Sequence, residues 1–172
     1  MIYKTLKNSA MPSMDYMHTF YNSQTLFAAA KAMAERIRQI IAEDKLTELC
    51  FVSASSSGAT ITTAVMALLY EEIPCNNSYV RKSNWTFRYH SDREYTMIKN
   101  ESALYMAYEC DRKRNIFILD DCIDTGATTD YIYDELKKLG INDRLNRIIV
   151  QQISLNVPKS WTSVVECFQN YS

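Results

Sequence analysis

Ile-Phe-Ile-Leu-Asp-Asp-Cys-Ile-Asp-Thr-Gly-Ala-Thr, residues 116–128, is the most informative stretch of this sequence. Its four apolar residues predict a buried strand. The two acids that follow must meet solvent, hydroxyl groups or a cation, because burying an unpaired charge is costly. Asp124 to Thr128 then offer consecutive N–H groups, hydroxyls and a small turn before a helix, as in an anion-binding nest. A plain strand-to-helix turn capped by Asp124 or Thr125 is the alternative, but the combination favours a sugar-phosphate site.

The segments around this stretch alternate between strand and helix patterns. Strands are expected at 49–54, 78–82, 116–119, 147–153 and 164–168. Helices are expected at 59–72 and 128–139, and a further one begins at Ser23 or Thr25 and has its last inward apolar residue at Ile41. Such alternation predicts a Rossmann-like α/β fold, with a mainly parallel central sheet and flanking helices, whose ligands bind beyond the carboxyl ends of the strands. Residues 1–22 are expected to be an irregular arm, 84–100 a hairpin or a mobile loop, and 102–109 a short helix.

Composition places the chain among globular proteins with a single domain spanning residues 1–172. Hydrophobic residues make up 47% and the net charge is −1, so no overall positive field recruits nucleic acid or an anionic membrane. The sequence has no membrane-span-length apolar run and no signal-peptide pattern. Five scattered cysteines without a Cys-x-x-Cys spacing predict neither a zinc site nor a disulfide framework, which favours a reduced, cytoplasmic protein.

Two further segments follow predicted strands. Ser55, Ser56, Ser57 and Gly58 form a small, hydroxyl-rich turn before a helix, which suits either a second phosphate site or a simple helix cap. Arg81-Lys82 ends the next strand, where a basic pair either contacts an anion or lies on a solvated edge.

Residues 116–128 closely resemble the phosphoribosyl pyrophosphate motif of the type I phosphoribosyltransferases. The resemblance implies that Asp120 and Asp121 bind the ribose 2′- and 3′-hydroxyls and contribute, through those hydroxyls or water, to a Mg²⁺ site. It assigns the 5′-phosphate to Asp124, Thr125, Gly126, Ala127 and Thr128. It also makes Asp124 a candidate catalytic base toward the N7 proton of a purine, which tilts the expected acceptor toward a 6-oxopurine.

The same resemblance extends over a phosphoribosyltransferase-type core at about 23–153. It implies that Ser55 to Gly58 hold pyrophosphate, although the Lys or Arg common in this loop is missing, and that Arg81 and Lys82 approach it. Residues 84–100 correspond to a mobile catalytic loop with Arg88, His90 and Arg93 as candidate contacts. A small variable hood is expected from 1–22 and 154–172, where Trp161 and Phe168 either recognise the acceptor or belong to the core.

The function implied is an enzyme that transfers the 5-phosphoribosyl group from phosphoribosyl pyrophosphate to a nitrogen nucleophile. A nucleobase is the expected small-molecule acceptor, Mg²⁺ assists the loss of pyrophosphate, and the resemblance also implies a homodimer. The missing basic residue in the Ser55–Gly58 loop favours a second hypothesis, a non-catalytic regulator that binds phosphoribosyl pyrophosphate or a nucleotide. An interaction module that keeps only the scaffold is a third.

Overall fold

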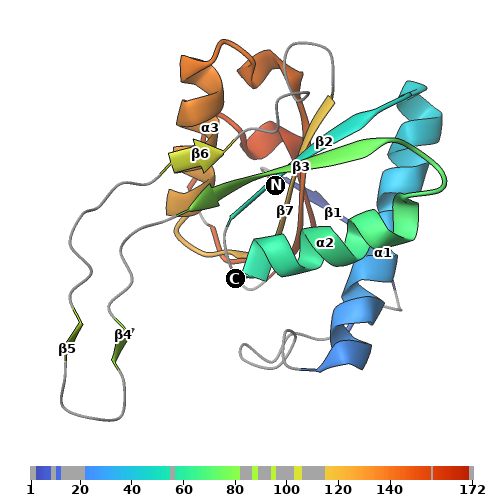
Figure 1. Cartoon of the computed structure of the whole chain (residues 1–172), viewed down its shortest axis with the longest axis horizontal. Helices are drawn as coiled ribbons and strands as arrows, with labels where there is room; N and C mark the ends of the chain where they lie inside the picture. The colour runs from blue at the N-terminus through green and yellow to red at the C-terminus, as the bar shows by residue number, and fades with distance from the viewer. Residues whose placement is uncertain are drawn as a thin grey trace.

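A seven-stranded sheet forms the centre of the computed structural model (Figure 1), which describes residues 3–8, 11–12, 22–54, 57–81, 87–88, 94–95, 103–105, 115–155 and 157–170. Its strands lie in the order β1-β9-β8-β7-β2-β3-β6. They comprise β1 (Lys4–Thr5), β2 (Leu49–Ala54), β3 (Cys75–Arg81), β6 (Ala103–Tyr105), β7 (Asn115–Ile123), β8 (Leu145–Ile153) and β9 (Val165–Asn170). Six strands are parallel, and β6 runs antiparallel to β3 at one edge. The predicted α/β fold with a mainly parallel sheet is confirmed.

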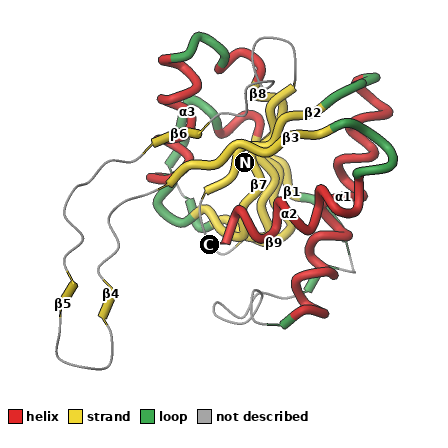
Figure 2. The backbone as a smooth tube through the Cα atoms, in the orientation of Figure 1, coloured by secondary structure: helices red, strands yellow, loops and turns green. Residues whose placement is uncertain are grey.

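Among the described residues, three α-helices cover the two faces of this sheet. They are α1 (Ser23–Asp44), α2 (Ser57–Leu69) and α3 (Ala127–Lys138), with short 3-10 turns η2 (Asn142–Arg144) and η3 (Thr162–Val164). Figure 2 shows α1 and α2 together on one side of the sheet and α3 on the other. The central strand β7 serves both layers, because alternate side chains of a strand point to opposite faces. Ile116 and Ile118 pack with the residues beneath α3, whereas Phe117 and Leu119 join the core formed with α1 and α2.

Three segments differ from or complete the sequence-based expectations. Residues 103–105 form strand β6 rather than part of a helix, because their backbone pairs with residues 79–81 of β3. Within the supposed irregular arm, Lys4–Thr5 pairs with Glu166 and Cys167 of β9. Of residues 84–100, for which a hairpin or a mobile loop is expected, only β4 (Phe87–Arg88) and β5 (Glu94–Tyr95) are described, and these two strands pair antiparallel.

A buried ion pair ties α1 to strand β9. The guanidinium of Arg36 donates from Nε to Glu166 Oε2 at 2.7 Å and from Nη2 to Oε1 at 3.0 Å. Lys4 Nζ and Arg147 Nε lie 3.2 Å and 3.4 Å from Glu166 Oε1. The buried carboxylate is therefore fully compensated, as a charge at such a position must be.

The cysteines and the helices bear on two further expectations. Cys75, Cys122 and Cys167 carry free thiols. Among the described residues, no helix is both long enough and apolar enough to cross a membrane.

Candidate functional site

The carboxyl end of β7 carries the two adjacent acids of the motif. The strand continues past the apolar run to Ile123, because its last residues still pair with β8. Asp120 is only 8% exposed, and its Oδ1 accepts a hydrogen bond from the N–H of Asp121 at 3.0 Å. Asp121 is half-buried. The two carboxylates therefore differ in access, and Asp121 is the one that a solvent-borne diol reaches more easily.

The first turn of α2 lies directly against this strand end at Gly58. A Cβ atom added to Gly58 would come within 3.0 Å of Asp120 Oδ1 and 3.1 Å of the Leu119 carbonyl oxygen. Only glycine allows the helix to approach the strand this closely. The structure thus brings together Ser57 and Gly58, from the serine-rich turn, and Asp120 of the motif. The start of α2 also favours the nearby carboxylate through the helix dipole.

The turn after β7 presents polar groups to solvent. Asp124, Thr125 and Ala127 are exposed, while Gly126 is buried and adopts a left-handed conformation with φ of +79°. Gly126 is the N-cap residue of α3 and has no side chain to cap the helix. Thr125 Oγ1 accepts the N–H of Ala127, the first residue of α3, at 3.3 Å. An exposed loop that leads directly into the N-terminus of a helix can bind an anion through its backbone N–H groups.

The loop is backed by a segment from the other end of the chain. The indole of Trp161 is 1% exposed and lies against Gly126. Its Nε1–H donates to Asp130 Oδ1 at 2.8 Å, and Lys159 Nζ donates to Asp130 Oδ2 at 2.9 Å. Burial opposes ionisation of Asp130, but the hydrogen bonds from Lys159 and Trp161 outweigh it and lower the pKa of this carboxyl.

Trp161 and Phe168 are core residues, the second of the two alternatives for these aromatics. Trp161 belongs to the core beneath α3, and Phe168 packs partly buried against the core of α1 and α2. Trp161, which is 1% exposed, is therefore not available to recognise an acceptor base. The contact between Trp161 and Asp130 could not be found from the sequence, because residues 31 positions apart on a loop and a helix share no periodic pattern.

The other predicted site residues are placed only in part. Thr128 is half-buried in the first turn of α3. Arg81 ends β3, two strands from β7, and Arg88 lies in β4; for both, only the backbone is described. Ser55, Ser56, Lys82, His90 and Arg93 lie outside the described residues.

The described residues do not form a complete metal site. They include no group of three or more His, Cys, Asp or Glu side chains arranged to hold a cation. Asp121, with Asp120 beside it, fits Mg²⁺ only as part of a larger set, since this ion prefers six oxygens and retains several waters. The remaining oxygens would come from the ligand and water.

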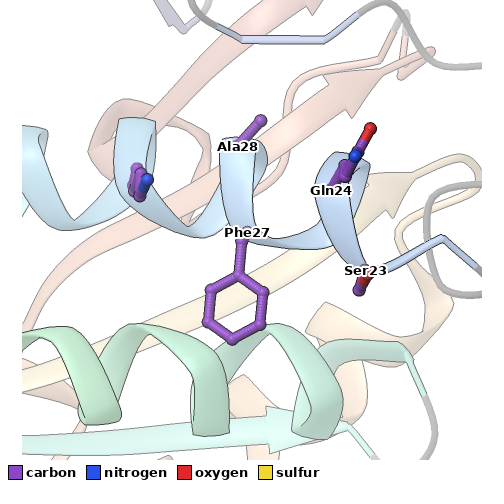
Figure 3. Close-up of a pocket in the computed structure, with 5 residues that line it drawn as sticks. Ser23, Gln24, Phe27 and Ala28 are labelled. Carbon is purple, nitrogen blue, oxygen red and sulfur yellow. The ribbon is translucent and has the colours of Figure 1, made fainter.

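Two hollows of the described surface lie away from the motif. One is lined by Ser23, Gln24, Phe27, Ala28 and Lys31 of α1, and Figure 3 shows the Phe27 ring pointing toward α2. Another lies between the end of α2 and the start of β3, next to Met66 and Tyr70. Neither is lined by a residue of the motif 116–128.

Comparison with solved structures follows this geometry. The hypoxanthine phosphoribosyltransferase of Trypanosoma cruzi matches with a TM-score of 0.57 and 15% identity over 85% of this chain and 77% of that one. The chain has a phosphoribosyltransferase-type fold. An adenine phosphoribosyltransferase matches at 0.59 and 16% (87% and 82% of the chains), and the purine phosphoribosyltransferase of Pyrococcus horikoshii at 0.53 and 19% (86% and 84%). No protein-family model and no curated protein sequence matches the chain.

Proposed function

We propose that this chain is a phosphoribosyltransferase that moves the 5-phosphoribosyl group of phosphoribosyl pyrophosphate to a ring nitrogen of a nucleobase. One observation carries the proposal. Residues 116–128 form most of the central parallel strand β7 and the exposed loop that leads into α3. Gly58 allows the start of α2 to pack against the carboxyl end of the same strand. The fold shared with enzymes named for hypoxanthine, adenine and purine transfer supports a nucleobase acceptor.

The proposed roles follow from exposure and chemistry. The N–H groups and hydroxyls at Thr125–Thr128 take the 5′-phosphate, and Asp121, with the less accessible Asp120, takes the ribose hydroxyls. Residues 55–58, together with Arg81 and Lys82, hold the pyrophosphate. Bound Mg²⁺ would offset charge on the leaving pyrophosphate.

Asp124 is the proposed base. Its carboxylate is exposed at the mouth of the loop, where it can accept the proton that the nucleobase nitrogen loses as that nitrogen bonds to C1 and pyrophosphate departs. The rest of the site binds and orients the two reactants, which accounts for much of the rate gain in a displacement of this kind. A 6-oxopurine is the proposed acceptor, because an acid at this position suits deprotonation at N7.

A regulator that binds the same ligand without turnover is the second candidate. It is favoured by the absence of any basic residue between Ser55 and Gly58 and by the near-complete burial of Asp120. The first feature leaves the proposed pyrophosphate loop without a positive charge, and the second limits the access of the ribose hydroxyls to the Asp120 carboxylate. An efficient transferase is expected to have both the charge and the access. In this case the cytoplasmic pool of phosphoribosyl pyrophosphate or of a nucleotide would be the signal, and a homodimer the simplest responding assembly.

The test is a calorimetric titration with phosphoribosyl pyrophosphate and Mg²⁺, followed by an assay of pyrophosphate release across a panel of nucleobases. Asp121→Asn should weaken binding by about tenfold, the effect of losing a charged hydrogen-bond partner. Asp134→Asn, an identical change at an exposed position of α3, should leave binding unchanged. Binding without release for any base would favour the regulator, and absence of binding would refute both candidates.

A further inference from the structure

The indole of Trp161 occupies the space that a side chain at residue 126 would need. Its Cζ2 and Cη2 atoms lie 3.1 Å and 3.2 Å from the position that a Cβ of Gly126 would take, and Leu155 Cδ1 lies 3.6 Å from it. The ring is 1% exposed. Trp161 therefore packs on the backbone of the loop proposed to bind the 5′-phosphate, without itself reaching the solvent-facing side.

The same indole also holds the helix that follows this loop. Its N–H donates to Asp130 Oδ1 at 2.8 Å, and the N–H of Asp130 donates to the Gly126 carbonyl oxygen at 2.8 Å. Gly126, Asp130 and Trp161 thus form a closed ring of contacts around the first turn of α3. Both ends of this turn are fixed by one rigid side chain.

A tryptophan that served only to fill the core would not need the interactions of Asp130 with its indole N–H and with Lys159. Asp130 places a negative charge in the first turn of a helix whose N-terminus faces an anion site, and that charge disfavours a second anion unless it is offset. Lys159 supplies the offset from 2.9 Å, and Trp161 engages the other carboxylate oxygen. Asp130 is thereby available as an anchor for the loop at little electrostatic cost to a phosphate.

We propose that Trp161 is a positioning residue for the 5′-phosphate: its ring on Gly126 and its N–H on Asp130 hold the loop and the first turn of α3 in the receptive conformation. This inference rests on the proposed function of the loop. Trp161 and Asp130 would then raise the affinity for the phosphate by holding the loop, without touching the ligand themselves. Pyrophosphate, proposed to bind at residues 55–58, should be insensitive to this support.

The test uses the full chain and two ligands measured separately by calorimetry, ribose 5-phosphate and inorganic pyrophosphate with Mg²⁺. Trp161→Phe removes the N–H together with the Cζ2 and Cη2 atoms that lie over Gly126, whereas Asp130→Ala leaves the indole in place and removes the acceptor of its N–H at a half-buried position. Both should raise the Kd of ribose 5-phosphate by about tenfold while changing that of pyrophosphate by less than about twofold. Asp130→Asn retains an oxygen for the indole and should restore most of the affinity.

Ile132→Val is the matched control, because it removes one methylene from the core beneath the same helix and should lower the thermal midpoint without changing either Kd. Equal weakening of both ligands, or unchanged ribose 5-phosphate binding in Asp130→Ala, would overturn the positioning role while leaving the proposed function intact. If the unmodified chain binds neither ribose 5-phosphate nor phosphoribosyl pyrophosphate, the proposed function itself fails, and the positioning role fails with it.

Discussion

Replacing Gly126 by alanine should destabilise the fold for two separable reasons. The first is the backbone, since φ of +79° costs an L-residue about 1–2 kcal/mol. A lower entropy of the unfolded chain offsets about 0.4–1 kcal/mol of this cost. The second is steric, because the new methyl group would lie 3.1 Å and 3.2 Å from two atoms of the buried Trp161 ring, and overpacking of this kind costs about 1–3 kcal/mol. The total expected loss is about 1–5 kcal/mol, with a central value of about 3 kcal/mol.

Gly140→Ala separates these two contributions. Gly140 also has a left-handed backbone, with φ of +69°, but nothing lies within 4 Å of the position its Cβ would take. It should therefore lose only the backbone share, a net of about 1 kcal/mol. Both variants and the parent chain are unfolded in urea and followed by far-UV circular dichroism, with free energies of unfolding compared at a common slope. Losses within about 0.5 kcal/mol of one another would show that the Trp161 contact does not constrain residue 126.

Three further predictions concern separate parts of the molecule. Asp124→Asn should slow turnover by about 10²-fold or more with a smaller change in KM, and an unchanged kcat would leave Asp124 a binding role only. Gly58→Ala should weaken pyrophosphate binding by about tenfold, because its Cβ would lie 3.0 Å from Asp120 Oδ1 and 3.1 Å from the Leu119 carbonyl oxygen. If calorimetry gives the same affinity as for the parent chain, binding does not depend on the close approach of α2 to the end of β7. Burial opposes ionisation of Glu166, but the Arg36 hydrogen bonds outweigh it and hold its pKa below the ordinary 4.5. A lowered folded-state pKa stabilises the fold above about pH 4.5, and that contribution is lost as pH falls toward the folded value. Glu166→Gln should thus flatten the fall in stability between about pH 5 and pH 3, and an unaltered acid slope would assign that fall to other groups.

The central part of the fold was predictable because its strands are continuous apolar runs. The run 116–119 marks β7 and also fixes the position of the acids that follow, since a parallel strand buried on both faces has a recognisable composition. The true end of β7, at Ile123, was not predictable from the run itself. It depends on backbone pairing of Cys122 and Ile123 with β8, which is a property of the partner strand.

The edges of the sheet and the support of the loop lacked a local signal. β1 is a pair of exposed polar residues, Lys4 and Thr5, which become a strand only through pairing with β9. In the sequence Trp161 is a single aromatic residue within a polar segment, and such a residue could lie either in an acceptor-binding hood or in the core. Its role depends on the distance to Gly126 and on the direction of its N–H, and both arise only when the C-terminal segment folds back beneath α3.

The position of β9 between β8 and β1 has a consequence for synthesis of the chain. Lys4 pairs with Glu166, 162 residues later, so the first strand has no partner until nearly all of the chain described here has left the ribosome. Until then β8, with Ile148, Ile149 and Val150 at its centre, is an unpaired apolar edge, which invites aggregation. Ribosome-bound chains that end before residue 160 should therefore depend on chaperones, because they lack β9.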